Sequence, residues 1–273
     1  MRATTTVDGR VTTYHEAGDG GGHPILLVHG YTGSADDFDP VLGGLAMDRR
    51  VVAVDLPGHG GSEGPDDEDV YGLTASSAWL LRFADAVGLD EFHLLGHSMG
   101  GLVVQRTAAA ASQRLYSLVL MATGLGALRE EACDLVVRMA VAARDHGIQA
   151  AWREVQSRPP RSVAAAVDPV REEFVRRRFM AFKPAALVGG ARNLIAAEPL
   201  GAFLRGIDIP VLVIHGEHDD AWTPAEQALL ARTIRRARHV VVPGAVHSPQ
   251  WENTDYWLKS VRTFLSEADG SLT

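Results

Sequence analysis

Short runs of apolar residues recur along the chain, each bounded by glycine, proline or polar residues. The runs are rich in branched side chains and lack polar alternation, which is typical of strands buried on both faces of a sheet. They predict six strands, at Ile25–Val28, Val51–Val54, Phe92–Leu95, Leu118–Met121, Val211–Ile214 and His239–Val242. Two earlier segments, Thr4–Thr6 and Val11–Tyr14, predict a hairpin that turns at Asp8-Gly9.

Helical patterns lie between these strands. Apolar residues recur at helical spacing in Leu73–Val87, and those of Asp255–Leu265 fall on one side of a helix. Gly101–Ala111 is rich in alanine, and Ala225–Thr233 is a mixed helical segment. Because strands and helices alternate, the sequence predicts an α/β fold in which a mostly parallel sheet carries helices on both faces.

The alternation stops between Gly124 and Leu204. This stretch has helical composition and no convincing buried strand, and Pro159-Pro160 interrupts it. We interpret residues 124–204 as a helical cap inserted into a core domain formed by residues 1–123 and 205–273. A run of ordinary surface helices is the alternative. The stretch also holds a group of arginines, Arg158, Arg161, Arg171, Arg176, Arg177 and Arg178.

We interpret these arginines as part of a solvated helix surface, because long charged side chains commonly cover one. Binding of a substrate carboxylate is the second interpretation. Apolar residues of the same region have two interpretations as well. They line a pocket or pack in the core, and the candidates are Met139, Trp152, Phe179, Phe182 and, beyond the stretch, Trp222.

Composition narrows the class of protein. The chain has 273 residues, of which 46% are hydrophobic and 22% charged, as in a folded globular protein. Its net charge of −8 argues against nucleic acid as a partner, since phosphate binding needs clustered Lys and Arg. Cys133 is the only cysteine, which excludes an intrachain disulfide. With no secretory signal pattern and no apolar run long enough to span a membrane, we expect a cytoplasmic protein without a membrane partner.

The strongest chemical motif is Gly96-His97-Ser98-Met99-Gly100, a G-x-S-x-G pentapeptide. It falls between a predicted strand and a predicted helix, where a sharp turn would lift the Ser98 hydroxyl clear of the sheet. The Met99 amide would then open the helix, where backbone donors are unpaired and the helix dipole favours negative charge. We therefore predict that Ser98 is a nucleophile.

A nucleophilic serine needs a base and an acid that orients the base. His247 follows the last predicted strand, and Asp219 follows the strand at Val211–Ile214. Both positions lie at the carboxyl ends of strands, the edge at which open α/β sheets bind ligands. The order Ser98, Asp219, His247 is typical of this motif, and Asp220 is the less favoured acid.

The oxyanion of an acyl-transfer reaction needs two donors. The turn His29-Gly30-Tyr31-Thr32-Gly33-Ser34 follows the strand at Ile25–Val28, so the Tyr31 amide can point to the same place as the Met99 amide. The Tyr31 side chain would then be free to line the pocket. His59 and His97 flank important turns, and we expect both to be packed and hydrogen-bonded and not catalytic.

Together these residues resemble the α/β-hydrolase superfamily, in the branch of small capped esterases, lactonases and cofactor-free haloperoxidase-like proteins. The matching segments are His29-Gly30-Tyr31, Asp55-Leu56-Pro57-Gly58-His59-Gly60-Gly61-Ser62, Gly96–Gly101, Gly216-Glu217-His218-Asp219 and Gly244-Ala245-Val246-His247. The resemblance implies an eight-stranded sheet and a cap after the sixth strand. It assigns the nucleophile to Ser98, the acid to Asp219 and the base to His247. It assigns the oxyanion hole to the amides of Tyr31 and Met99.

The sequence therefore predicts a serine hydrolase that cleaves a small carboxylic ester or lactone through an acyl-enzyme, with no metal or organic cofactor. Two alternatives stay open. The same residues serve C–C bond hydrolases, amidases and menaquinone-pathway lyases, which the segment from Asp55 to Gly60 also resembles, and arginines around Ser98 would favour the lyases. The second alternative is a non-catalytic ligand receptor on the hydrolase scaffold.

Overall fold

The structure, a computed structural model, describes residues 1–157 and 169–270. Within them, eight strands form one sheet in the order β1-β2-β4-β3-β5-β6-β7-β8. The strands are β1 (Arg2–Val7), β2 (Arg10–Ala17), β3 (Gly22–Val28), β4 (Arg49–Val54), β5 (Phe92–His97), β6 (Leu115–Met121), β7 (Val211–Gly216) and β8 (Ala237–Val242). The β1–β2 and β2–β4 pairs are antiparallel, and the remaining neighbours are parallel.

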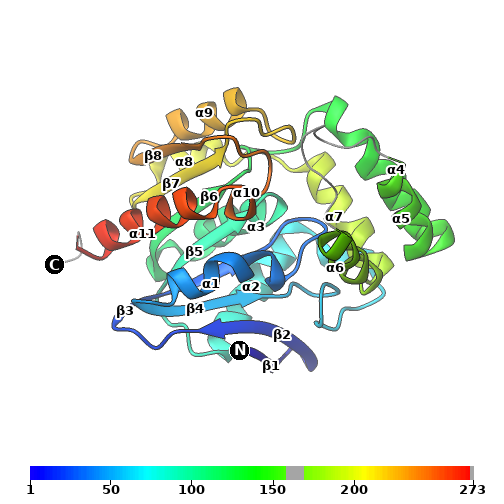
Figure 1. Cartoon of the computed structure of the whole chain (residues 1–273), viewed down its shortest axis with the longest axis horizontal. Coiled ribbons are helices and arrows are strands. Elements are labelled where there is room, and N and C mark those ends of the chain that lie inside the picture. The colour runs from blue at the N-terminus through cyan, green and yellow to red at the C-terminus, as the bar shows by residue number, and fades with distance from the viewer. Residues whose placement is uncertain (158–168, 271–273) are drawn as a thin grey trace.

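The central strands are apolar at successive positions because helices cover both faces of the sheet (Figure 1). On β3, for example, Leu26 and Val28 join the hydrophobic core on one face, and Ile25 and Leu27 join the core on the other. Helices α2 (Leu73–Ala86), α3 (Met99–Ala111) and α9 (Pro224–Thr233) contribute to the first core, and α1 (Asp39–Leu45) and α11 (Thr254–Gly270) to the second.

Five helices of the described chain lie between β6 and β7. They are α4 (Glu130–His146), α5 (Ile148–Gln156), α6 (Pro169–Met180), α7 (Pro184–Ala196) and α8 (Gly201–Gly206). Helices α4 to α7 gather at one end of the sheet, on the right in Figure 1, whereas α8 lies beside β7 and β8. The expected boundary at residue 204 falls inside α8, and the division into core and cap stays a prediction. Arg158, Arg161 and Pro159-Pro160 lie outside the described residues.

Short helical segments complete the fold. They are η1 (Ala35–Phe38), η2 (Glu68–Tyr71), η3 (Ser112–Arg114) and α10 (Pro249–Glu252). No helix in the described ranges combines the length and apolar character that crossing a membrane requires.

The last strand differs from the expectation of burial on both faces. β8 lies at the edge of the sheet, and only its final residue, Val242, is fully buried, while Val241 is 39% exposed. An apolar run alone does not distinguish an edge strand from a central one. The predicted hairpin is confirmed: β1 pairs with β2, and both Asp8 and Gly9 have positive φ, as a tight hairpin turn requires.

We predict that Trp257→Ala lowers the free energy of unfolding by about 3–5 kcal/mol, because the change removes a large buried side chain. Trp257 on α11 is fully buried, and its indole Nε1 lies 3.0 Å from Met121 Sδ. Its neighbour Tyr256 is 42% exposed and serves as the control, for which truncation to alanine should change the free energy of unfolding by less than about 0.5 kcal/mol. Urea unfolding of both variants measures the difference; equal effects would contradict the prediction.

Candidate active site

Four loops bring the predicted site residues together at the end of the sheet where the carboxyl ends of the parallel strands lie. Tyr31 follows β3, Ser98 follows β5, Asp219 follows β7 and His247 follows β8. These four strands are parallel to one another, so their carboxyl ends share an edge. Residues far apart in the sequence therefore lie within reach of one another.

The turn at Ser98 has strained backbone geometry. Its φ of +56° lies in a region that side chains other than glycine rarely adopt. The two glycines of the motif allow the backbone to pack closely around this turn. A Cβ on Gly100 would lie 2.4 Å from the carbonyl oxygen of His29, and one on Gly96 would lie 2.4 Å from the carbonyl oxygen of Gly100. The two glycines of the motif are thus required by close backbone approach.

His247 connects Ser98 to Asp219. Its Nε2 lies 3.0 Å from Ser98 Oγ, and its Nδ1 lies 2.9 Å from Asp219 Oδ1. A carboxylate only accepts hydrogen bonds, so Nδ1 carries the proton and Nε2 is left to accept the Ser98 hydroxyl. This arrangement has the geometry of a nucleophile, a base and an orienting acid.

Asp219 sits in a buried network that keeps it ionised. Burial raises the pKa of its carboxyl group, but the charge and hydrogen bond of His247, followed by hydrogen bonds from Gln227 and the Ala221 amide, outweigh burial and lower the pKa. Gln227 Nε2 donates to Asp219 Oδ2 at 2.9 Å. Sequence reasoning did not find Gln227, because a glutamine in a mixed helix gives no signal. Asp220 is exposed, and its carbonyl oxygen accepts a hydrogen bond from Arg129.

The Met99 amide is the first of α3, and helical geometry provides no acceptor for it within the helix. The turn that contains Tyr31 packs against Ser98, since a Cβ on Gly30 would lie 3.0 Å from Ser98 Cβ. Tyr31 lines the cavity beside Ser98, as expected, but its hydroxyl is engaged. Its hydroxyl donates to the Leu187 carbonyl oxygen on α7 at 2.8 Å, so the ring ties this turn to the inserted helices.

The neighbouring histidines are packed and hydrogen-bonded, which confirms the expectation for His59 and His97. Burial lowers the pKa of His59 to about 4 and that of His97 to about 3, the latter with a further contribution from His247. Neutral His97 donates from Nε2 to the His247 carbonyl oxygen at 2.8 Å. His97 therefore holds the backbone of His247 in place, a role that its position in the motif did not reveal.

A cavity of about 600 Å³ opens above Ser98 and His247. Four of the apolar candidates line it, namely Met139, Trp152, Phe179 and Trp222. Phe182 packs instead against His59, with ring centroids 4.8 Å apart. Of the arginines singled out from the sequence, Arg178 lines the cavity, whereas Arg176 is exposed and paired with Glu173.

Comparison with known proteins identifies the family of this fold. The family model for the alpha/beta hydrolase fold matches residues 23–149. The structure matches the enol-lactonase from Burkholderia xenovorans LB400 with a TM-score of 0.86 and 28% identity, over 97% of this chain and 100% of that one. The chain belongs to the α/β-hydrolase superfamily.

Two other proteins are also similar to this chain. A thermophilic esterase from Thermogutta terrifontis aligns with a TM-score of 0.85 and 26% identity, over 98% of this chain and 99% of that one. The dihydrolipoyllysine-residue acetyltransferase component of the acetoin cleaving system of Pseudomonas putida is 41% identical over 121 residues, which is 44% of this chain and 32% of that protein. The chain spans about a third of the length of two such curated relatives, 32% and 30%.

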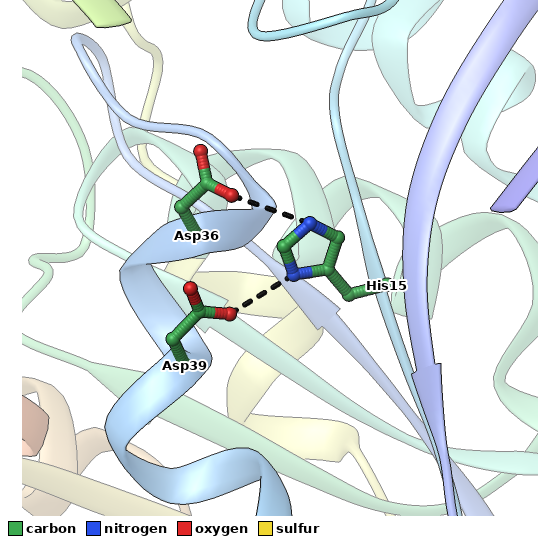
Figure 2. Close-up of side chains that lie close together, drawn as sticks. All are labelled: His15, Asp36 and Asp39. Carbon is green, nitrogen blue, oxygen red and sulfur yellow. Dashed lines mark hydrogen bonds and ion pairs between the residues drawn. The ribbon is translucent and has the colours of Figure 1, made fainter. Parts of the chain in front are cut away.

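One group of side chains in this α/β-hydrolase has the residue types of a metal site. His15 on β2 faces Asp36 and Asp39, with Nε2 3.2 Å from Asp36 and Nδ1 3.0 Å from Asp39 (Figure 2). The two carboxylates lie at opposite nitrogens of one ring, and a metal ion binds one nitrogen of an imidazole. The geometry suits a protonated ring that donates to both acids. The hydrogen bond to Asp39 raises the pKa of His15, although burial opposes it.

We predict that His15→Gln destabilises the protein more at pH 5.5 than at pH 8.5. Because the pKa of His15 is raised in the folded state, its stabilisation is fully present below the unfolded value near 6.5 and is lost as pH rises through the folded pKa. The Asp39 side chain is 51% exposed, so solvent screening limits the effect to about 1 kcal/mol or less. Urea unfolding at both pH values measures it, and a larger loss at pH 8.5 would contradict the assignment.

Proposed function

We propose that the protein is a serine hydrolase that cleaves a small carboxylic ester or lactone through an acyl-enzyme. The observation that carries the proposal is the pair of hydrogen bonds made by His247, to Ser98 Oγ at 3.0 Å and to Asp219 Oδ1 at 2.9 Å. The names of the relatives, an enol-lactonase and an esterase among them, support the substrate class.

The proposed reaction begins when His247 Nε2 takes the proton of Ser98 as Oγ attacks the substrate carbonyl carbon. The amides of Tyr31 and Met99 donate to the oxyanion, and each donor contributes about 3 kcal/mol by analogy with single-donor deletions. His247 then gives the proton to the alcohol oxygen as the ester bond breaks. For a lactone, that oxygen stays attached to the acyl group.

Water completes the cycle. His247 Nε2 accepts a proton from the water that attacks the acyl-enzyme carbonyl carbon, and returns it to Ser98 Oγ as the acid leaves. Asp219 keeps the proton on His247 Nδ1 and balances the charge of the imidazolium. Its lowered pKa suits this role, because the group stays ionised at neutral pH.

We also propose that residues 124–204 act as a cap over this site. Helices α4, α5 and α6 contribute side chains to the cavity wall, among them Met139, Trp152 and Phe179. Such a wall selects substrates by size. The hydrogen bond from Tyr31 to the Leu187 carbonyl oxygen fixes the cap to the oxyanion turn.

Substitution of Ser98 by alanine removes the proposed nucleophile. Ser98→Ala should lower kcat for p-nitrophenyl butyrate, or for a small lactone followed by pH-stat, by about 10⁴–10⁶. The wild-type protein should bind a fluorophosphonate probe covalently at Ser98, and the variant should not. Turnover that persists in Ser98→Ala would overturn the hydrolase mechanism, and wild-type protein that is neither labelled nor active would favour the receptor alternative.

A second prediction separates the two neighbouring acids. Asp219→Asn should lower kcat by about 10⁴, because the amide leaves His247 in the wrong tautomer. Asp220→Asn is the matched control, and its kcat should stay within a few-fold of wild type. The same p-nitrophenyl butyrate assay measures both; a large loss in Asp220→Asn with little in Asp219→Asn would reassign the acid.

A further inference from the structure

The wall of the cavity above Ser98 includes a positively charged side chain that has no role in the reaction proposed above. Three arginines line the cavity, but two are more exposed than the third: the side chains of Arg129 and Arg138 are 37% and 43% exposed. The side chain of Arg178, on α6, is 12% exposed. Arg178 is therefore the best shielded of the three positive charges.

Arg178 is held rigidly in the cavity wall. Its Nη1 donates to the carboxylate of Asp37 in η1, and the guanidinium carbon lies 5.5 Å from the ring centroid of Phe174. Asp37 in turn accepts the Ser34 amide at 3.3 Å, and a Cβ on Gly33 would lie 2.2 Å from Asp37 Oδ2. The ion pair thus fixes Arg178 against the turn that presents the Tyr31 amide.

The guanidinium retains unused donor capacity. Arg178 Nε is buried and has no hydrogen-bond partner among the described residues, and Asp37 engages only Nη1. A buried donor without an acceptor costs about 1–3 kcal/mol. One edge of a guanidinium has the fork geometry that binds a carboxylate through two parallel hydrogen bonds.

The positive charge also reaches the catalytic end of the cavity. After burial, Arg178 is among the groups that lower the pKa of His29, of His59 and of His97, which precedes Ser98 in the chain. Burial raises the pKa of Asp37, and the charge and hydrogen bond of Arg178 oppose that rise.

We propose that Arg178 is a specificity-determining residue that binds a carboxylate carried by the substrate, away from the bond that is cleaved. The substrate class is then a monoanionic ester or lactone, such as the half-ester of a dicarboxylic acid. This inference rests on the proposed hydrolase function. The net negative charge of the chain does not argue against this contact, because Arg178 lies in the cavity wall.

The test compares two esters that match in length and differ in charge, monomethyl adipate and methyl hexanoate, with release of acid followed by pH-stat. The wild-type protein should have the higher kcat/KM for monomethyl adipate. Arg178→Gln should lower kcat/KM for monomethyl adipate by about 10- to 100-fold, mainly through KM, because a distant contact adds uniform binding. Its kcat/KM for methyl hexanoate should fall by a smaller factor, so the preference for monomethyl adipate over methyl hexanoate should decrease.

Two further variants make the result decisive. Arg176→Gln removes the same charge from the same helix at an exposed position, and its preference should match wild type. Arg178→Lys keeps a charge beside Asp37 but lacks the planar fork, so its preference should fall between those of wild type and Arg178→Gln. Thermal unfolding by circular dichroism checks that each variant is folded.

Failure of this inference differs from failure of the hydrolase function. Wild-type protein that cleaves methyl hexanoate without preferring monomethyl adipate would overturn the role of Arg178 and leave the hydrolase function intact. Equal losses on both esters in Arg178→Gln would assign the Arg178–Asp37 pair a structural role only. Wild-type protein that cleaves neither ester and is not labelled at Ser98 would overturn both proposals.

Discussion

The site depends on one close backbone contact, between the start of α3 and the end of β3. Gly100 lies so near the carbonyl oxygens of Val28 and His29 that a Cβ there would approach both to 2.5 Å or less. This contact sets the direction in which α3 leaves the sheet, and it thereby holds Ser98 at a φ of +56°. Strain of this kind costs about 1–3 kcal/mol, and the surrounding buried core keeps the turn from relaxing.

Most of the fold follows from local pattern. The six apolar runs and the hairpin predicted the eight strands because a buried strand needs little beyond branched residues and a turn at each end. Burial of β8 was mispredicted because exposure depends on the position of a strand in the sheet, which no run of residues encodes. Helix α1, with Gly43 and Gly44 in its seven residues, carries too little helical pattern to be predicted.

The site also contains some residues that the sequence predicts and others that it does not. The G-x-S-x-G motif and the two strand-end loops pointed to residues that the fold brings into contact, because strand ends in a parallel sheet converge. The supporting contacts had no such signal. Gln227 reaches Asp219 from α9, and Arg178 reaches Asp37 across 141 residues of sequence. Contacts of this kind depend on where whole helices are placed, so they are visible only in three dimensions.

Ser98 and His247 are far apart in the sequence, so the ribosome adds them to the chain at different times. The two residues are 149 positions apart, and β8, which precedes His247, occupies the edge of the sheet. At ribosomal speeds of ~5–20 residues per second, about 7–30 s separate the synthesis of the two residues. During that interval Ser98 lacks the histidine that the proposed reaction uses as its base, so its hydroxyl is an ordinary alcohol. In the proposed mechanism, the order of synthesis therefore delays reactivity until the last strand has docked.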